Sequence, residues 1–363
     1  MPWSEFRSLK YSVFSTFLSI NLPVNHNFKD ICLNFNRILL NSPLQEILMD
    51  NKKNLVSIII PVYNEEESLQ KITSKLKETF AKLSKYNFEI IFIDDGSFDN
   101  SLAELKQLSK TYQEVNYLSF SRNFGHQMAV KAGLDSSRGN CVISMDADLQ
   151  HPPELIEDML QKWAAGYDIV YTIRKEDKNL SFFKRKTSKA FYRFLNFLSD
   201  IELEQGAADF RLLDRQVVDV LRNMKENNIF LRGMVSWMGF KQYGIKYEAK
   251  EREFGVTKYS YRKMLSLAIN GITSFSIKPL RIAAWIGLLA SAVGFSYAIF
   301  SIFAFFLTDL NLTGWTSLIM AVIFFGGLQL LTLGIIGEYI GKLFMQVKGR
   351  PNYIIKSSTF HED

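Results

Sequence analysis

Two long apolar runs near the C-terminus constrain this chain more than any other feature. Residues 282–307 (IAAWIGLLASAVGFSYAIFSIFAFFL) and 315–336 (WTSLIMAVIFFGGLQLLTLGII) contain no charged residue. Each run exceeds the roughly 20 residues that a helix needs to cross the hydrocarbon core of a bilayer. One such run could be the buried helix of a soluble protein. Two neighbouring runs instead predict a pair of transmembrane helices within residues 282–343.

The charges around these runs predict their orientation. Basic residues flank the pair on both sides: Lys278 and Arg281 before it, and Lys342, Lys348 and Arg350 after it. Because positive flanks stay on the cytoplasmic side, we expect an inner-membrane protein whose large N-terminal region and both termini are cytoplasmic. The 43 basic and 37 acidic residues give a net charge of +6, which suits a domain held against anionic lipid and does not indicate a nucleic-acid partner.

The region before the apolar runs divides into an extension and an α/β domain. Residues 1–54 have no clean signal-peptide pattern, and Met49 resembles a natural start, so we expect an extension of unknown role. In residues 55–250, apolar strand-like runs alternate with amphipathic helical segments, which predicts a mostly parallel sheet with helices on both faces. The expected strands are residues 55–62, 88–94, 115–120, 141–146 and 168–172.

Two further segments are expected to lie at the membrane surface, and a third to form a tail. Residues 181–200 mix Phe and Leu at helical spacing with Lys and Arg, which favours an interfacial helix over one packed on the sheet. Residues 251–281 are expected to form a juxtamembrane interfacial helix, and residues 344–363 a cytoplasmic tail.

Acidic pairs follow two of the expected strands. Asp94 and Asp95 precede Gly-Ser, and could form a turn that caps the next helix or could accept hydrogen bonds from a nucleotide. Asp146 and Asp148 could likewise be capping acids, or could hold a divalent cation beside a diphosphate. Ligands of such sheets bind beyond the carboxyl ends of the strands. The sequence has neither G-x-G-x-x-G nor a P-loop, so any phosphates must be held in another way.

Six motifs occur in an order and spacing that resemble a known family. They are IIIPVYNEEESL, FIDDGSFDNS, SFSRNFGHQMAVKAGL, MDADLQHPPELI, ADFRLLDR and REFGVTKYSYRKML. Together they resemble the family-2 glycosyltransferases of GT-A fold, in particular the polyisoprenyl-phosphate glycosyltransferases, over about residues 55–350. An arrangement of two membrane spans after the catalytic domain resembles that of the bacterial glucosyl and aminoarabinose enzymes. It is less similar to the synthases that have no span, one span or four spans.

The resemblance implies roles for individual residues. A first group would bind the nucleotide sugar: Pro61, Tyr63, Glu65, Asp94, Asp95, Asn123, Asp146, Arg252 and Lys258. A second would bind Mg²⁺ or Mn²⁺: Asp146, Asp148 and Gln150. The catalytic group is Asp148, Asp209 and Arg211, and the acceptor-phosphate group is Arg174, Lys184 and Ser188. The family usually has Arg where Lys184 stands, which puts bidentate binding there in doubt. His151 is expected to be a loop residue, because hard cations prefer oxygen ligands.

The function implied is a metal-dependent, inverting transfer of one hexose from a nucleotide sugar to a polyprenyl phosphate. UDP-glucose and undecaprenyl phosphate are the expected substrates. A GDP-mannose-using dolichyl-phosphate mannose synthase and an aminoarabinose transferase are the alternatives. The Gln-x-x-Arg-Trp signature of processive synthases is missing, and residues 230–237 (FLRGMVSW) occupy that region. A polysaccharide synthase and a non-catalytic membrane scaffold are therefore less favoured. The oligomeric state stays open, with a homo-oligomer such as a tetramer as one candidate.

Overall fold

The computed structural model of the chain divides into two units, residues 1–53 and residues 54–363. The described parts of the chain are residues 53–175, 196–198, 204, 206–226, 229–248, 272–307 and 314–360. The expected extension and the expected interfacial helices over residues 181–200 and 251–281 lie largely outside these ranges, so they stay predictions. The helices and strands of the described ranges all belong to the second unit.

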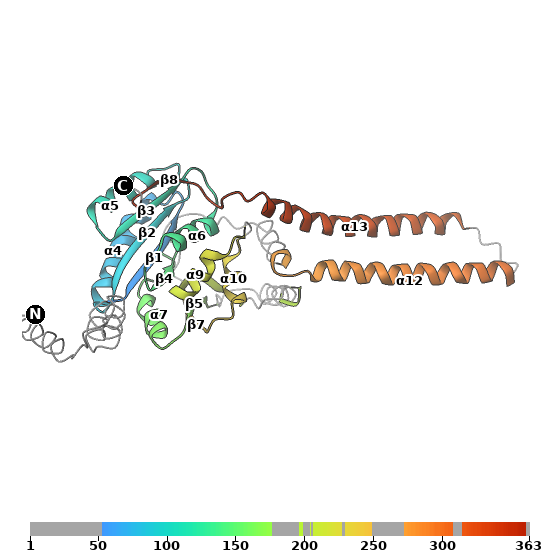
Figure 1. Ribbon diagram of the computed structural model, residues 1–363, viewed down its shortest axis with the longest axis horizontal. Coiled ribbons are helices and arrows are strands. Elements are labelled where there is room, and N and C mark those ends of the chain that lie inside the picture. Colours follow the sequence, from blue (N-terminus) through green and yellow to red (C-terminus); the bar gives the residue numbers. More distant parts are fainter. Residues whose placement is uncertain are drawn as a thin grey trace, which may run out of the picture. The chain divides into compact units, whose positions relative to one another are not determined.

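One sheet of eight strands forms the centre of this unit (Figure 1). Its strands are β1 Leu55–Val62, β2 Asn87–Asp94, β3 Val115–Phe120, β4 Cys141–Ser144, β5 Ile169–Arg174, β6 Ala207–Asp214, β7 Gln242–Tyr247 and β8 Ile355–Ser358. They lie in the order β7-β5-β6-β4-β1-β2-β3-β8. Strands β1 to β4 are parallel to one another, whereas β6 runs antiparallel between β4 and β5.

Helices cover both faces of the sheet. The main helices in the described ranges are α4 Glu66–Lys82, α5 Ser101–Thr111, α6 His126–Ser136, α7 Leu155–Ala164, α9 Arg215–Asn223, α10 Leu231–Trp237, α12 Lys278–Leu307 and α13 Trp315–Val347. Side chains alternate between the faces of a strand. Ile58 and Ile60 of β1 accordingly pack in one core with α4, α5 and α7, while Ile59 packs in the other with α6, α9 and α10. This confirms the predicted α/β fold and explains the three consecutive isoleucines of β1, residues 58–60.

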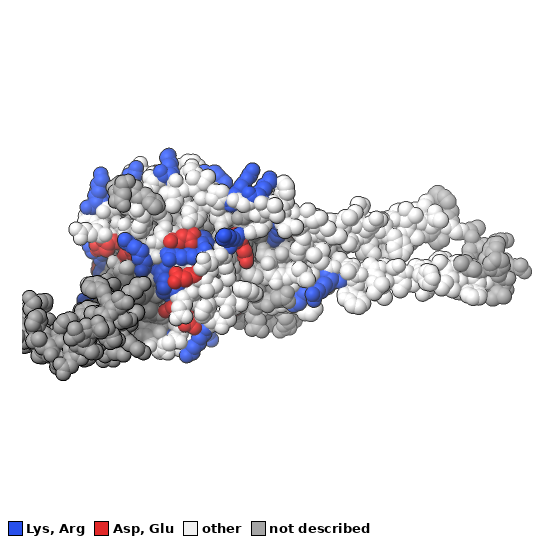
Figure 2. All heavy atoms as spheres, viewed as in Figure 1, with Lys and Arg blue, Asp and Glu red and all other residues white. Residues whose placement is uncertain are grey.

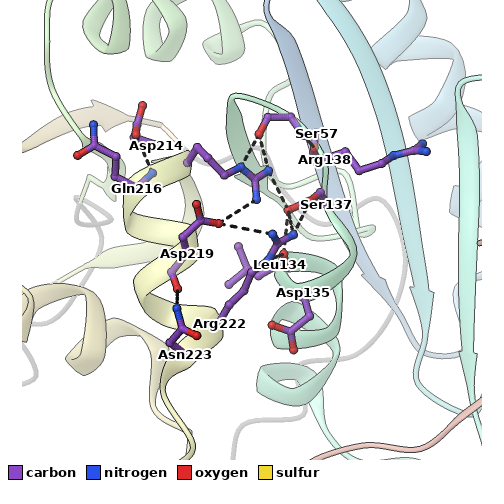
Figure 3. A network of polar contacts seen from close by, with 12 residues as sticks. Ser57, Leu134, Asp135, Ser137, Arg138, Asp214, Gln216, Asp219, Arg222 and Asn223 are labelled. Atoms are coloured by element: carbon purple, nitrogen blue, oxygen red, sulfur yellow. Dashed lines mark hydrogen bonds and ion pairs between the residues drawn. The ribbon is translucent and has the colours of Figure 1, made fainter. Parts of the chain in front are cut away.

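Two arginines of α9 hold the C-terminal end of α6. Arg222 donates from Nε to the Leu134 carbonyl at 3.0 Å and also reaches the Ser137 carbonyl, as Figure 3 shows. Arg215 donates from Nε to the Gly139 carbonyl at 2.7 Å. The last carbonyls of a helix lack intrahelical partners, and cationic side chains satisfy them well. Helix α6 is therefore fixed at the end opposite to His126, its first residue.

Glu89, near the start of β2, links this strand to β1 and to the loop before β4, and it supplies a stability test. Its buried carboxylate accepts the Ser57 hydroxyl at 2.6 Å and the Arg138 backbone N–H at 2.8 Å. We expect Glu89→Ala to lower stability by about 2 kcal/mol, because buried donors lose their partner, and thermal unfolding of the purified protein measures this. Glu78→Gln on the exposed side of α4 is the matched control. An unchanged Tm for Glu89→Ala would contradict the assigned role.

Helices α12 and α13 coincide with the two long apolar runs. Their segments Lys278–Ser301 and Leu318–Val347 are long and apolar enough to cross a membrane. Apolar side chains such as Trp285 and Leu330 are largely exposed, and Figure 2 shows the two helices almost free of charged side chains. Large exposed apolar surface of this kind marks contact with lipid or protein. The two helices could thus span a membrane, as predicted.

The chain after α13 returns to the sheet. We call residues 348–360 the C-terminal strap. Within it, Tyr353 donates to Asp135 of α6 at 2.9 Å and stacks on Phe120 of β3, with ring centroids 5.2 Å apart. Strand β8 then pairs antiparallel with β3. Residues 344–363 were expected to be a tail, and the completion of the sheet edge by part of them was not predicted.

Candidate active site

The loops after β1 and β2 are tied together into one surface. The Asn64 backbone N–H donates to Ser97 Oγ at 3.0 Å, and the Phe98 N–H donates to Asn64 Oδ1 at 2.9 Å. Asn64 has a φ of 55°, a conformation that asparagine tolerates better than most residues. The Tyr63 ring lies edge-on to Phe98, with centroids 6.3 Å apart. The end of β1 and its loop therefore lie beside the Asp94 loop, and we call their joint surface the rim. It contains the predicted nucleotide-binding residues Pro61, Tyr63 and Glu65.

Asp94 and Asp95 are 1% and 3% exposed, and Asp94 contacts the turn while Asp95 contacts the loop after β3. Asp94 accepts the Ser97 N–H at 2.9 Å and the Ser119 hydroxyl at 2.7 Å. Asp95 accepts the backbone N–H groups of Phe124 and Gly125 at 2.6 and 2.9 Å. Burial raises the pKa of Asp95, against the lowering effect of these two hydrogen bonds. Both acids thus build the loops of the rim, and a direct contact with nucleotide stays a prediction for them.

The loop that supports Asn123 depends on a glycine. Gly96 has a φ of +70°, and a Cβ there would lie 2.6 Å from the Arg122 carbonyl carbon and 2.7 Å from the Asn123 backbone nitrogen. Only glycine combines this conformation with so close an approach. The Asp-Asp-Gly turn therefore brings Asn123 close to the rim, and the predicted nucleotide role of Asn123 stays untested.

Asp146 and Asp148 lie just beyond β4, which ends at Ser144 and not at Asp146 as predicted. Asp146 Oδ1 lies 2.8 Å from His126 Nε2, and Asp148 Oδ1 accepts the Gln150 N–H at 3.1 Å. Between the acids and Gln150, Leu149 adopts a left-handed φ of 60°, which turns the loop sharply. The strand end therefore presents two carboxylates on a tight loop.

His126 is a site residue that was not predicted from the sequence. Burial alone would lower its pKa, but the hydrogen bond and charge of Asp146 raise that pKa to about 9. Desolvation would raise the pKa of Asp146, but the same contact lowers it. His126 follows the polar cluster 121–125 after β3, so its place at another strand end was the available signal.

His151 is a buried loop residue in this structure. Its Nδ1 accepts the Asp146 backbone N–H at 3.0 Å, and its ring stacks on Phe210 at a centroid distance of 5.0 Å. These contacts fix the loop that carries the two acids.

Asp209 sits on β6 between two arginines. Arg232 of α10 donates from Nε and Nη2 to the two Asp209 oxygens, at 2.8 and 2.9 Å. Arg211 Nη2 lies 3.4 Å from Asp209 Oδ1. Burial alone would raise the pKa of Asp209, but the charge and hydrogen bonds of Arg232, aided by Arg211, hold it well below its usual range. The predicted pair Asp209 and Arg211 thus meets a third residue, Arg232, which was not predicted.

The remaining predicted residues divide into those that the structure describes and those that it does not. Arg174 ends β5, and its exposed side chain is near enough to Tyr247 to lower the pKa of that phenol, whose burial raises it overall. The charges of Asp146 and Asp148 act in the opposite direction and raise the pKa of the same phenol. The other four predicted residues lie outside the described parts: Lys184, Ser188, Arg252 and Lys258.

The donor set at the end of β4 suits a hard divalent cation. Within the described ranges, no three His, Cys, Asp or Glu side chains gather as a closed metal site. Mg²⁺ at phosphate-binding sites commonly takes only one or two carboxylates and completes its shell with phosphate oxygens and water. Asp146 and Asp148, with the nearby Gln150 amide, are residues of that kind.

A sheet with acidic strand ends, followed by two apolar helices that could span a membrane, fits a glycosyltransferase of GT-A fold. Residues 57–222 match the profile of Glycosyl transferase family 2, and residues 278–343 match that of the GtrB C-terminal hairpin. The chain belongs to glycosyltransferase family 2, as the motifs predicted.

Relatives match over almost their whole length. The uncharacterized glycosyltransferase YkcC of Bacillus subtilis is 46% identical over 83% of this chain and 93% of that protein. The SfII prophage-derived bactoprenol glucosyl transferase of Shigella flexneri is 39% identical over 84% of this chain and 98% of that protein. The prophage bactoprenol glucosyl transferase homolog of Escherichia coli is 40% identical over 83% and 98%.

Proposed function

We propose that this protein transfers a single glucose from UDP-glucose to a polyprenyl phosphate of the undecaprenyl type. The observation that supports this most is the similarity, over 98% of their length, to relatives named bactoprenol glucosyl transferase. The acidic strand ends and the apolar hairpin fit both substrates, because one is a nucleoside diphosphate sugar and the other a lipid.

The proposed transfer depends more on stabilisation of negative charge on the phosphates than on a general base. An oxygen of the acceptor phosphate forms a bond to the anomeric carbon while the bond from that carbon to the donor diphosphate breaks, with inversion. The electron pair leaves with UDP. A divalent cation held by Asp146 and Asp148, with Gln150 close by, would neutralise the leaving diphosphate. Arg174, Lys184 and Ser188 are proposed to hold the acceptor phosphate in line.

The strap supports the proposed topology of the hairpin. The sheet receives strands from before α12 and, as β8, from after α13. Both ends of the hairpin must then lie on the side of the membrane that holds the sheet. With basic residues at both ends, that side is proposed to be the cytoplasm.

A donor panel tests the proposed function. Purified full-length protein is incubated with a short polyprenyl phosphate and, in separate reactions, with UDP-glucose, GDP-mannose and a UDP-aminoarabinose donor. We expect a lipid-extractable product from UDP-glucose, its loss with EDTA, and its return with Mg²⁺ or Mn²⁺. A product from another donor alone would shift the proposal to that sugar, and a water-soluble polymer would favour a processive synthase. No product with any donor and metal would refute the transferase proposal.

A further inference from the structure

The Asp209 carboxylate lies beside two guanidinium groups. In the described contacts, Arg232 Nε lies 2.8 Å and Arg211 Nη2 3.4 Å from Asp209 Oδ1, and we call these three side chains the Asp209 cluster. We propose that Arg232 binds a phosphate oxyanion at the transfer site, and that Asp209 holds Arg232 in place and does not act as a base. This inference rests on the function proposed above and adds a substrate-binding residue to it.

The cluster is held rigidly beside the acids of β4. The Asp209 backbone carbonyl accepts the Ser144 hydroxyl at 2.6 Å, and Ser144 is two residues before Asp146. On the other side, the Leu231 N–H donates to Gln127 Oε1 at 3.1 Å, and Gln127 follows His126. Arg232 is therefore fixed through its neighbours to the two elements that carry His126 and Asp146. A guanidinium so preorganised costs little to order when a ligand arrives.

Exposure singles out Arg232 as the arginine that can meet a ligand. The side chain of Arg211 is 8% exposed and also donates to the Ala208 carbonyl at 3.1 Å, which marks it as an internal support. The side chain of Arg232 retains 33% exposure, against 19% for Asp209. The charges of Arg232 and Asp209 both act on His126, the partner of Asp146. An oxyanion beside Asp146 would thus lie near the exposed part of the Arg232 side chain.

The same contacts make Asp209 a poor proton acceptor. Both its oxygens take hydrogen bonds from the fork of Arg232, and a carboxylate stabilised by two guanidinium groups gains little from a proton. An acceptor hydroxyl would find no effective base in Asp209. A phosphate acceptor is already ionised when it binds, so it needs a cation to hold it and not a base. Arg232 supplies such a cation.

The test compares four full-length variants with the wild type. We expect Arg232→Gln to lower kcat/KM about 100-fold, as loss of a single oxyanion donor does. Arg232→Lys keeps the charge without the fork, so a loss of about 10-fold is expected. Asp209→Asn should fall between these two, because it loosens Arg232 without removing it. Lys106→Gln, on the exposed side of α5, is the matched control for loss of one positive charge.

Two measurements identify the oxyanion. A raised KM for polyprenyl phosphate with unchanged inhibition by UDP assigns Arg232 to the acceptor phosphate. Weaker inhibition by UDP assigns it to the donor diphosphate, and either result upholds the proposal. A kcat/KM for Arg232→Gln within twofold of wild type overturns it, as does a loss of activity that follows only a fall in Tm. If the wild type itself makes no lipid-linked sugar, the proposed function fails first.

The pH profile separates a positioning Asp209 from a basic one. The second ionisation of a phosphate monoester has a pKa of about 6, so kcat/KM should fall as the pH decreases below this value. This acidic limb of the pH profile reflects ionisation of the acceptor phosphate, so it should persist in the Asp209→Asn variant. Disappearance of the limb in Asp209→Asn, together with a larger loss than in Arg232→Gln, would make Asp209 the base and overturn the proposal.

Discussion

Replacing Asp148 with alanine is expected to lower the rate of sugar transfer at least about 10³-fold. The reason is the charge that develops on the departing diphosphate, which a cation beside the strand end must neutralise. Asp148 lies in the loop that follows β4, and the left-handed turn at Leu149 bends this loop beside it. Loss of this carboxylate removes one of only two acids in the predicted cation site, so excess Mn²⁺ should recover little of the activity.

The measurement is lipid-linked product formed over a range of Mg²⁺ and Mn²⁺ concentrations. Asp158→Asn is a matched control, because Asp158 lies on the exposed face of α7, the next helix. It should keep wild-type activity and metal dependence. Transfer by Asp148→Ala at the wild-type rate would remove the basis for a cation at this strand end and would revive the non-catalytic scaffold as an alternative.

Ending the chain at Gly349 is expected to abolish activity and to lower the Tm by more than about 10 °C. This truncation removes β8 and Tyr353, and so exposes the edge of β3 and the face of Phe120, which is 2% exposed in the intact chain. Removal of a whole strand with its aromatic contact costs several kcal/mol, a large part of the stability of an ordinary domain. Unpaired β3 would also invite edge-to-edge association.

Two controls make the truncation informative. A chain that ends at Phe360 keeps β8 and should behave as the wild type. Tyr353→Phe keeps the stack on Phe120 and loses only the hydrogen bond to Asp135, so about 1 kcal/mol is expected. Thermal unfolding and transfer assays report both quantities. Wild-type Tm and activity in the chain that ends at Gly349 would show that the strap is dispensable.

The central strands were predictable because burial on both faces leaves a continuous apolar run. Strand β1 shows this, with Ile58, Ile59 and Ile60 in two different cores. Strand β6 was not predicted as a strand, since its sequence AADFRLLD mixes charges with apolar residues. Its place depends on antiparallel pairing with β4, a contact of long sequence separation. Strand β8 (IKSS) has no apolar pattern and forms only because β3 offers an edge.

The candidate site shows the same division. The acids of the Asp-x-Asp loop were predictable, because they directly follow a buried strand. Their partners were not, since His126 and Arg232 come from the starts of two helices whose positions depend on packing. From the sequence, the segment that contains Arg232 was of interest only because it lacks the Gln-x-x-Arg-Trp signature of processive synthases. Pairing of Arg232 with Asp209 needs α10 to lie against β6, which no local pattern reveals.

The place of β8 in the sheet has a consequence for biosynthesis. A ribosome makes β1 to β7 first, then the apolar hairpin, and β8 last, so the nascent sheet keeps an open β3 edge throughout. The edge closes only after the hairpin has left the ribosome. If the hairpin inserts into the bilayer on emergence, completion of the catalytic fold must follow membrane insertion. Such an order would keep the enzyme from maturing away from its lipid substrate, and it would make a chain stalled in the cytosol both unfinished and prone to aggregate.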